Sequence, residues 1–465
     1  MHKLPIALGA IVLLCAAVPV HAAEITRVAT AMDDAQPLEV DLDVGYLHER
    51  HDTRITRESL QLDPATGKQN TVLEDELQQS RVDDEMQFRI AIGLWHDLEL
   101  HVLAPYAISD VQSWDYATIG GVSVAPTSTL ANNHLDISGC ASAQACDPNG
   151  AAKPIIAAPG GSKRAGFRDP TIGVAWAPIS EEREVRLHPE LYPPGKPVST
   201  WVVGFDYTLP LPGSVDDPSV FGFAAADATT SPSSRPSRPV IRKAHVFSLW
   251  TAFSKRYRVL DPYFKVQVNL PLAIKGNGPG DGAYDNCWHP ESLADVATQN
   301  CADPAWKGTT GYQPPVTAGF VFGSELVIAE DTSRAQKFAF DLRGTATFIS
   351  QGRDYTQVTD ALGKLTYADQ YASLGGSLGL YGRIARWLQV RVAGSLGIDT
   401  PHFLTDESIG KDLNGDGTVD ISAGNAIKSR EQSPTYDFRL DQVGRRLHAE
   451  TSVVWGVTAF ASLTF

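Results

Sequence analysis

Hydrophobic and polar residues alternate near the end of the chain, over residues 450–465. One set of alternate positions, which includes Val453, Trp455 and Phe465, contains no charged residue, and the other set is smaller and more polar. A period of two is typical of a β-strand whose two faces meet different surroundings. The run is about as long as a tilted strand needs to cross a bilayer. The pattern predicts a long strand, either in a membrane barrel or at the edge of a soluble sandwich.

The same alternation recurs along the chain and predicts about twelve strands in all. The first of them places Glu39, Asp41 and Asp43 on one face. Because neither lipid nor a dry core accepts unpaired carboxylates, these residues indicate a wet interior. The expected strands span residues 38–47, 86–94, 98–108, 167–177, 201–209, 244–254, 260–270, 316–328, 338–348, 372–382, 388–398 and 450–465.

The connections between these strands alternate in length. Short turns, such as residues 95–97, indicate antiparallel hairpins, whereas residues 48–82, 109–165 and 399–448 are expected to be long polar loops. With the C-terminus in the periplasm, the long loops point outside the cell, and residues 178–197 are the one long connection inside. Aromatic residues cluster near both strand ends, as in the girdles of a membrane barrel. The sequence therefore predicts an all-β fold, a transmembrane antiparallel up-and-down β-barrel with long extracellular loops.

The N-terminus predicts export. Lys3 precedes an apolar run over residues 6–18, and Ala22 stands where a signal peptidase prefers a small residue. We expect a signal peptide over residues 1–22, an N-terminal periplasmic segment or partial plug over residues 23–37, and the barrel over residues 38–465. No later apolar run reaches the length of a transmembrane helix. The predicted location is the outer membrane, with its lipid as the surrounding solvent.

Charge and cysteine content narrow the classes further. The formal net charge of −15 argues against nucleic-acid binding, which needs a basic face. Four cysteines follow the signal peptide, and an even number in an exported protein favours disulfides. A metal site is the alternative, although the sequence has little histidine near them apart from His289. The expected pairs are Cys140–Cys146 and Cys287–Cys301.

A short acidic motif near the C-terminus matches the spacing of an EF-hand-like calcium loop. Ala423 occupies the twelfth position, where such loops carry a bidentate glutamate, so Asp399, Asp406 or Glu407 would have to supply the missing ligand. The motif predicts a weak Ca²⁺ site in the last extracellular loop, and an ordinary Asp/Asn/Gly turn is the alternative. No other cofactor is expected. The candidate ligands are Asp412, Asn414, Asp416, the carbonyl of Thr418, and Asp420.

The inward faces of the expected strands carry charges of both signs, with acids in excess. A barrel of this size lies between filled small barrels and open porins, so partial occlusion is expected. The residues either cross-link a filled lumen or line a narrow solute path, and both interpretations stay open. The expected lumen-lining residues are Glu39, Asp41, Asp43, Arg89, Glu99, His101, Asp206, Lys265, Glu325, Asp341, Arg343, Arg391 and Glu450.

Two stretches resemble a known barrel family. Residues 93–106, GLWHDLELHVLAPY, and residues 166–174, GFRDPTIGV, resemble a hairpin and a strand start of outer-membrane barrels of the phenol-degradation MetA-pathway type. Arg168 departs from the second pattern, where the family has glycine. The resemblance implies transport of small, often hydrophobic or aromatic, solutes. The terminal Phe465 is similar to the signal that the barrel-assembly machinery reads, which implies that machinery as a partner.

We therefore expect an outer-membrane channel or transporter for small-molecule solutes. One alternative is a structural or adhesive surface barrel without transport. Another is a barrel hydrolase, which needs a nucleophile and a base at one level of the wall. His101, His245 and His448 are candidate bases, but no nucleophile lies in a recognisable motif beside them. An enzyme is therefore not the expected function.

Overall fold

The computed structural model describes residues 23–33, 36–132, 154–188, 191, 199–211, 244–274, 303–331, 334–420 and 430–465. The predicted signal peptide lies outside these residues, as do Cys140, Cys146, Cys287 and Cys301, so both predictions remain untested. Within the described ranges, no helix has the length and apolar character needed to cross a membrane.

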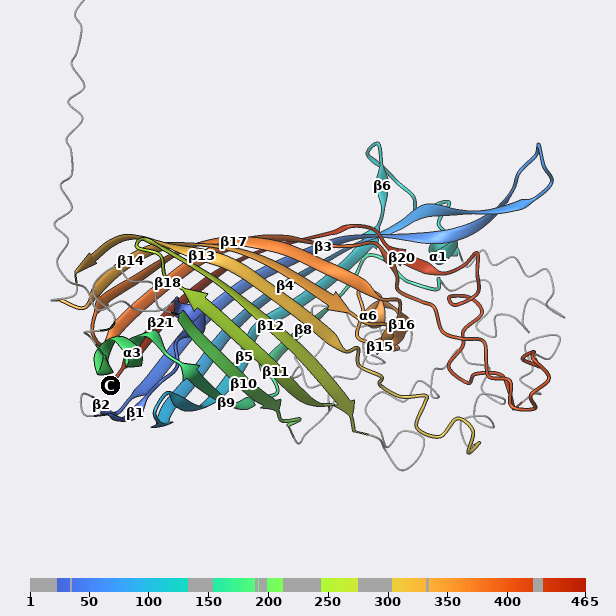
Figure 1. Ribbon diagram of the computed structural model, residues 1–465. Helices are drawn as coiled ribbons and strands as arrows, with labels where there is room; N and C mark the ends of the chain where they lie inside the picture. The colour runs from blue at the N-terminus through green and yellow to red at the C-terminus, as the bar shows by residue number, and fades with distance from the viewer. Residues whose placement is uncertain are drawn as a thin grey trace, which may run out of the picture.

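Twelve antiparallel strands form one closed barrel (Figure 1). The last strand pairs with the first, and the first also pairs with the second, so the ring has no free edge. This confirms the predicted all-β barrel. We call the pairing of the last strand with the first the seam of the barrel. The strands are β3 Val40–Leu62, β4 Gln69–Trp95, β5 Leu98–Tyr116, β9 Thr171–Ile179, β10 Ser199–Thr208, β11 Ala244–Lys255, β12 Leu260–Ala273, β13 Thr317–Asp331, β14 Gln336–Ile349, β17 Tyr371–Ala385, β18 Leu388–Asp399 and β21 Ser452–Thr464.

Alternation in the sequence gives the barrel wall two unlike faces. In β12, Leu260, Phe264 and Leu270 point outward and are exposed, whereas Asp261 and Tyr263 point inward and are buried. An apolar belt around the whole barrel would be unfavourable in water, but it suits lipid. The closed ring also satisfies the backbone hydrogen bonds internally, as a membrane-spanning wall requires.

One end of the barrel, which we call the inner end, holds the C-terminus and the short turns (Figure 1). His96 and Asp97 have φ of 29° and 60°, the left-handed conformation of a tight hairpin turn, and join β4 to β5. The long inner connection contains the helix α3, Glu181–Leu187, and Ser180 accepts a hydrogen bond from the Arg183 N–H at 3.4 Å as its N-cap. The small hairpin of β1, Ala31–Asp33, and β2, Gln36–Leu38, lies at the same end.

The prediction of a polar loop over residues 48–82 is wrong. β3 and β4 pair without a gap in chain order from Val40 opposite Ile92 to Leu62 opposite Gln69, with one irregularity near Ile55. The far half forms a ribbon beyond the barrel rim (Figure 1). A ribbon in water needs no apolar face, because cross-strand hydrogen bonds satisfy its backbone while polar side chains remain solvated. The loss of apolar alternation therefore marks where the strands leave the lipid rather than where they end.

The predicted loop over residues 109–165 is also partly wrong. β5 continues to Tyr116 and pairs with an additional strand, β8, Gly160–Phe167.

Further short elements complete the outer end, opposite the C-terminus. They are β6 Thr118–Ile119, β7 Val122–Ser123, α1 Thr129–Asn132, β15 Gly352–Asp354, α6 Thr359–Leu362, β16 Thr366–Ala368, β19 His402–Phe403 and β20 Leu447–Ala449. We call the outer-end residues 117–132, 154–164, 352–369, 402–420 and 430–449 the cap.

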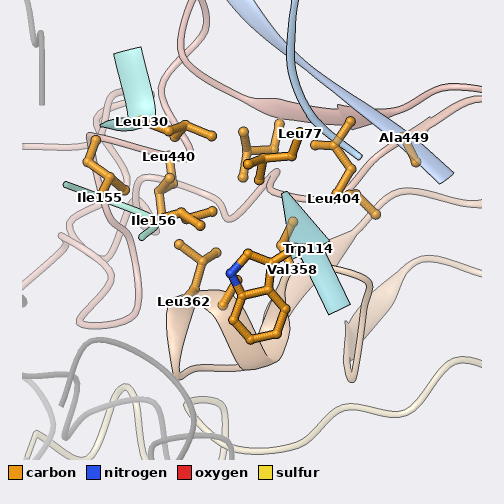
Figure 2. Packing of buried hydrophobic residues seen from close by; sticks show 13 residues of the cluster. Leu77, Trp114, Leu130, Ile155, Ile156, Val358, Leu362, Leu404, Leu440 and Ala449 are labelled. Carbon is orange, nitrogen blue, oxygen red and sulfur yellow. The ribbon is translucent and has the colours of Figure 1, made fainter. Parts of the chain in front are cut away.

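A buried hydrophobic cluster holds the cap together (Figure 2). Ile55 and Leu77 come from the ribbon, and Trp114 comes from β5, where its Nε1–H donates to the Ala157 carbonyl at 2.9 Å. Burial of these side chains gives the cap its own small core. The remaining members come from α1, α6, β20 and the loops between them: Leu130, Ile155, Ile156, Val358, Ala361, Leu362, Leu404, Leu440, Leu447 and Ala449.

The connection between β14 and β17 crosses the outer mouth of the barrel. Its helix α6 contacts β8, which pairs with β5. In the closed ring, β5 and β14 lie on opposite sides, because equal numbers of strands separate them in both directions. The cap therefore bridges the barrel from one wall to the other.

Candidate functional site

A polar cavity of about 290 Å³ lies inside the barrel, toward the inner end, and we call it the lumen chamber. The inward faces of several strands line it, which follows from the strict alternation of the wall. Among the predicted lumen residues, its lining includes Asp41, Asp43, Arg89, Glu99, His101, Asp206 and Lys265. Glu24, Ile25, Arg27, Ala175 and Trp250 complete it.

Arg89 links three neighbouring strands across the chamber wall. It donates to Asp43 Oδ2 at 2.9 Å and also pairs with Glu99. Asp43 lies directly opposite Arg89 in the β3–β4 register, and Glu99 is the second residue of β5. Glu99 is buried, so its charge requires such a partner. These contacts hold the inward-facing side chains of β3, β4 and β5 together on the side of the chamber near the seam between β3 and β21.

A second network faces it from β5, β10, β11 and β12. His101 Nε2 and Trp250 Nε1 lie 3.0 and 2.9 Å from the two carboxylate oxygens of Asp206. The Lys265 ammonium lies 4.2 Å from the centre of the Trp250 ring, within cation–π range. Gly173 makes this arrangement possible, because a Cβ there would lie 2.1 Å from Asp206 Oδ1.

The N-terminal segment enters the barrel from the inner end and lies against the chamber. Residues 23–30, which include the 3₁₀ turn η1 Glu24–Thr26, form what we call the N-terminal plug. Arg27 donates to Glu39 Oε1 at 2.6 Å and to Asp41 Oδ1 at 3.2 Å. The Ala29 N–H donates to Glu99 Oε2 at 2.8 Å. Side-chain carboxylates of the wall therefore bind both the backbone and the one arginine of the plug.

Other predicted lumen residues lie elsewhere on the inner wall. Asp341 accepts hydrogen bonds from Arg343 at 2.9 Å and Arg391 at 3.0 Å. Glu325 pairs with Lys337 at 2.9 Å. Glu450 lies at the outer end, where its Oε1 accepts from the Thr56 hydroxyl at 3.2 Å, away from the lumen chamber. The structure thus distributes the predicted set over more than one group.

Nothing in the sequence pattern marks three of the chamber residues. Glu24 and Arg27 belong to a segment without alternation, and Trp250 lies in a strand whose two faces are both largely apolar. A signal for Trp250 exists only in the register, because Gly204 lies opposite it and leaves room for the indole ring.

A second cavity, of about 170 Å³, lies beneath the cap, and we call it the outer chamber. His51 Nε2 lies 2.7 Å from Asp399 Oδ2 at its wall. Tyr371 and His402 stack with their ring centroids 4.0 Å apart. Arg81 binds Asp110 through two hydrogen bonds of 2.8 and 2.9 Å. The described lumen therefore contains polar spaces toward both of its ends.

A buried ion pair fastens the cap over the outer chamber. Arg164 donates to both carboxylate oxygens of Asp360, at 2.7 and 2.6 Å, and both side chains are almost fully buried. Ser162 and Tyr355 also donate to this carboxylate, each at 2.5 Å. A bidentate Arg–carboxylate pair with every oxygen satisfied is the arrangement in which a buried pair is best compensated.

Asp441 gives the cap an expected pH dependence. Burial raises the pKa of its carboxyl from 3.8 to about 7, and the nearby Glu407 and Asp437 carboxylates act in the same direction, against Lys364. The stabilising effect of the proton is complete below about pH 4 and is lost as the pH rises through about 7. We expect the wild-type cap to exchange amide hydrogens more readily at pH 8 than at pH 5, after correction for intrinsic rates. An Asp441→Asn variant should lose part of that pH dependence, and identical profiles would contradict the assignment.

The loop that matches the spacing of an EF-hand calcium loop, residues 412–420, forms a series of turns in which side chains accept hydrogen bonds from the backbone. Asp412 accepts from the backbone N–H groups of Gly415 and Gly417 at 2.6 and 2.8 Å, and Asp416 accepts from Thr418 at 2.8 Å. Over the described ranges, His, Cys, Asp and Glu side chains form no group of three or more that could hold a metal ion. Binding of Ca²⁺ by this loop stays a prediction.

The carboxylate beside this loop is Glu431, which the sequence pattern does not mark. It accepts from the backbone N–H groups of Leu413 and Asn414 at 3.0 Å and of Asp420 at 2.7 Å. The three acids expected to complete the site bind other residues. Asp399 contacts His51, Asp406 pairs with Arg446, and Glu407 pairs with Arg353.

The candidate catalytic histidines have carboxylate or tyrosine partners. His101 contacts Asp206, His245 Nδ1 lies 2.6 Å from the Tyr207 hydroxyl, and His448 Nδ1 lies 3.4 Å from Glu450 Oε1. These contacts do not place a serine or cysteine nucleophile beside a base.

Comparisons with known proteins give a broad likeness only. No family model matches the sequence, and no curated protein matches it. Similar solved structures include an outer-membrane channel from Pseudomonas putida F1, at 8% identity over 91% of this chain and 95% of that one, with a TM-score of 0.38. A Pseudomonas aeruginosa FadL homologue shares 9% identity over 92% and 90%, with a TM-score of 0.31. The outer membrane protease OmpT from Escherichia coli shares 8% identity over 92% and 96%, with a TM-score of 0.26. At such low values, function must be inferred from the residues of this chain.

Proposed function

We propose that the protein is an outer-membrane channel for small polar solutes. The observation that carries this proposal is the lumen chamber, a polar space lined by acids and bases inside a closed barrel with an apolar outer wall. Polar groups on the inner face suit a wet path, and the apolar belt suits lipid. The N-terminal plug and the cap lie at its two ends, so we propose a narrow or gated path rather than an open pore.

The lining of the chamber favours polar over hydrophobic solutes. Arg89, Lys265 and Asp206 present charge to the space, and the described lining includes few apolar side chains. An apolar solute entering such a space would leave polar groups without hydrogen-bonding partners. The hydrophobic or aromatic solutes implied by the family resemblance are therefore the less favoured choice for this chain.

We further propose that the chain is exported through its signal peptide and inserted into the outer membrane by the barrel-assembly machinery. The predicted signal peptide directs export, and the barrel-assembly machinery reads the terminal Phe465. The backbone of Phe465 pairs with Val40 through hydrogen bonds of 3.0 and 3.1 Å, so the proposed signal residue also completes the seam of the barrel.

Reconstitution in planar bilayers tests the channel. Wild-type protein should carry a small ion current in a KCl gradient. Lys265→Gln should shift the reversal potential toward cation preference, because it removes a positive charge from a confined polar space. Lys255→Gln is the matched control. It makes the same charge change at the end of β11, beside Tyr257, outside the chamber.

Three outcomes would contradict the proposal or its location in the lumen chamber. Absence of current from both the wild-type protein and a variant without the plug would favour a surface barrel that does not transport. Hydrolysis of lipid or peptide by the purified barrel, lost on substitution of His101, would favour the enzyme. Equal reversal potentials for the two lysine variants would show that ions do not pass through the lumen chamber.

A further inference from the structure

Two carboxylates lie side by side on the inner wall, outside the lumen chamber. Asp261 of β12 is directly opposite Glu325 of β13 in the strand register. Their residues are 0% and 2% exposed. Like charges at such a position repel one another and lose hydration, so the pair requires compensating cations or a bound proton.

The compensation among described residues is incomplete. The Lys337 ammonium donates to Glu325 Oε2 at 2.9 Å, and the backbone N–H of Glu24 donates to Oε1 at 2.7 Å. Neither oxygen of Asp261 has a hydrogen-bond partner within the described part of the chain. A buried carboxylate without a partner is rare in folded proteins and requires an explanation, of which a bound cationic group is one.

The first residue of the predicted mature chain lies next to this pair. Ala23 is 0% exposed, and its carbonyl accepts from both the N–H and the hydroxyl of Thr26 at 2.9 Å. The Thr26 hydroxyl lies 2.8 Å from that of Ser254, which is paired in register with Tyr263. Because Tyr263 and Asp261 lie on the same face of β12, the plug begins beside the carboxylates.

Cleavage after Ala22 would create a cation at this point. Hydrolysis adds water across the Ala22–Ala23 peptide bond, leaving a carboxylate on the released peptide and an ammonium on Ala23. The α-amino group has an ordinary pKa of about 8, so it is largely protonated at neutral pH. It offers three hydrogens to acceptors, whereas the uncleaved amide offers one and carries no charge.

We propose that Asp261 and Glu325 form a binding site for a primary ammonium, and that its occupant is the α-ammonium of Ala23. The site is complete only after signal-peptide cleavage at Ala22, on which the proposal depends. The ammonium supplies the hydrogen-bond donors that the Asp261 oxygens lack. It also anchors the first residue of the plug, one residue before the Glu24 contact with Glu325. Maturation therefore fastens the plug inside the barrel.

Amine acylation of the protein purified from outer membranes tests this site. N-terminal sequencing first establishes whether the chain begins at Ala23. The folded protein is then treated at pH 7 with an N-hydroxysuccinimide ester, and the N-terminal peptide is quantified by mass spectrometry. We expect the Ala23 amine of the folded protein to react at least about tenfold more slowly than in urea, which corresponds to one unit of pKa. The variant Asp261→Asn/Glu325→Gln should react faster than wild type.

The controls separate the site from simple burial and from misfolding. Glu450→Gln removes a carboxylate at the outer end and should leave the acylation rate unchanged. Heat-modifiable migration shows that each variant retains the barrel. A refolded chain with Gly-Ser before Ala23 moves the ammonium away and should react at the rate of the unfolded chain.

Three results would overturn the proposal. These are a chain that begins elsewhere than at Ala23, a wild-type amine as reactive as in urea, and equal protection in wild type and the double variant. None of these readouts depends on ion current, so the ammonium site and the channel function stand or fall separately.

Discussion

Deletion of residues 23–30 is expected to raise the single-channel conductance several-fold in planar bilayers. The segment lies inside the barrel, where Ala23 and Ala29 are fully buried and Arg27 binds the wall carboxylates Glu39 and Asp41. Val28 packs against a small cluster of Ala175, Ala177 and Val202. Since these contacts fill space at the inner end, their removal widens the path that ions must follow.

Variants that weaken the plug to different degrees distinguish loss of the plug from a general loss of structure. Arg27→Ala keeps the full length of the chain but removes the ion pairs to Glu39 and Asp41, so we expect an intermediate conductance with more frequent openings. Arg27→Lys keeps the charge and should remain near wild type. Unchanged conductance in a deletion variant that still migrates as a folded barrel would place the narrowest barrier at the cap instead.

Asp360→Asn is expected to loosen the cap while the barrel stays folded. The substitution leaves the Arg164 guanidinium buried without its counter-charge, and breaking a buried pair in this way typically costs about 3–5 kcal/mol. Limited proteolysis should therefore cut cap segments, residues 352–369 above all, at rates far above wild type. The barrel itself should remain heat-modifiable, because its strands are held by continuous ladders of hydrogen bonds.

Asp303→Asn is the matched control for loss of the buried Arg164–Asp360 ion pair. Asp303 also forms two hydrogen bonds with an arginine, at 2.5 and 2.9 Å, but its partner Arg430 is exposed. Water solvates both groups when the pair is broken, so cleavage should change little. If both variants are cut at the wild-type rate, the Arg164–Asp360 pair does not hold the cap closed.

The wall of the barrel could be predicted because the information is local. Each strand carries its two faces in alternate residues, and short turns such as His96-Asp97 join neighbours in order. The seam between β3 and β21 then follows from closure. The ribbon of β3 and β4 could not be predicted, because polar side chains on both faces of a strand give the same sequence pattern as a loop. Its backbone nevertheless stays paired.

The sequence predicts a periplasmic segment or partial plug over residues 23–37, but the contacts of the plug and the cap could not be predicted, because they join residues far apart in the sequence. The Glu24 N–H and Glu325 are 301 residues apart in the sequence, and Arg164 and Asp360 are 196 residues apart, so only the folded barrel brings each pair together. The cap core uses isolated apolar residues, such as Leu404 and Leu440, which have no period in their polar surroundings. The lumen charges were recognisable as inward-facing, but their division between the lumen chamber and other groups on the inner wall depends on strand register.

The loop that joins β14 to β17 has a mechanical consequence. A closed hydrogen-bonded ladder resists stretching around its circumference, but it bends easily, so an untied ring can flatten into an ellipse. Contact of α6 with β8 acts as a cross-brace between opposite walls and resists this flattening. Loss of the Arg164–Asp360 contact would therefore alter the cross-section along the whole tube, including the distances between charges in the remote lumen chamber.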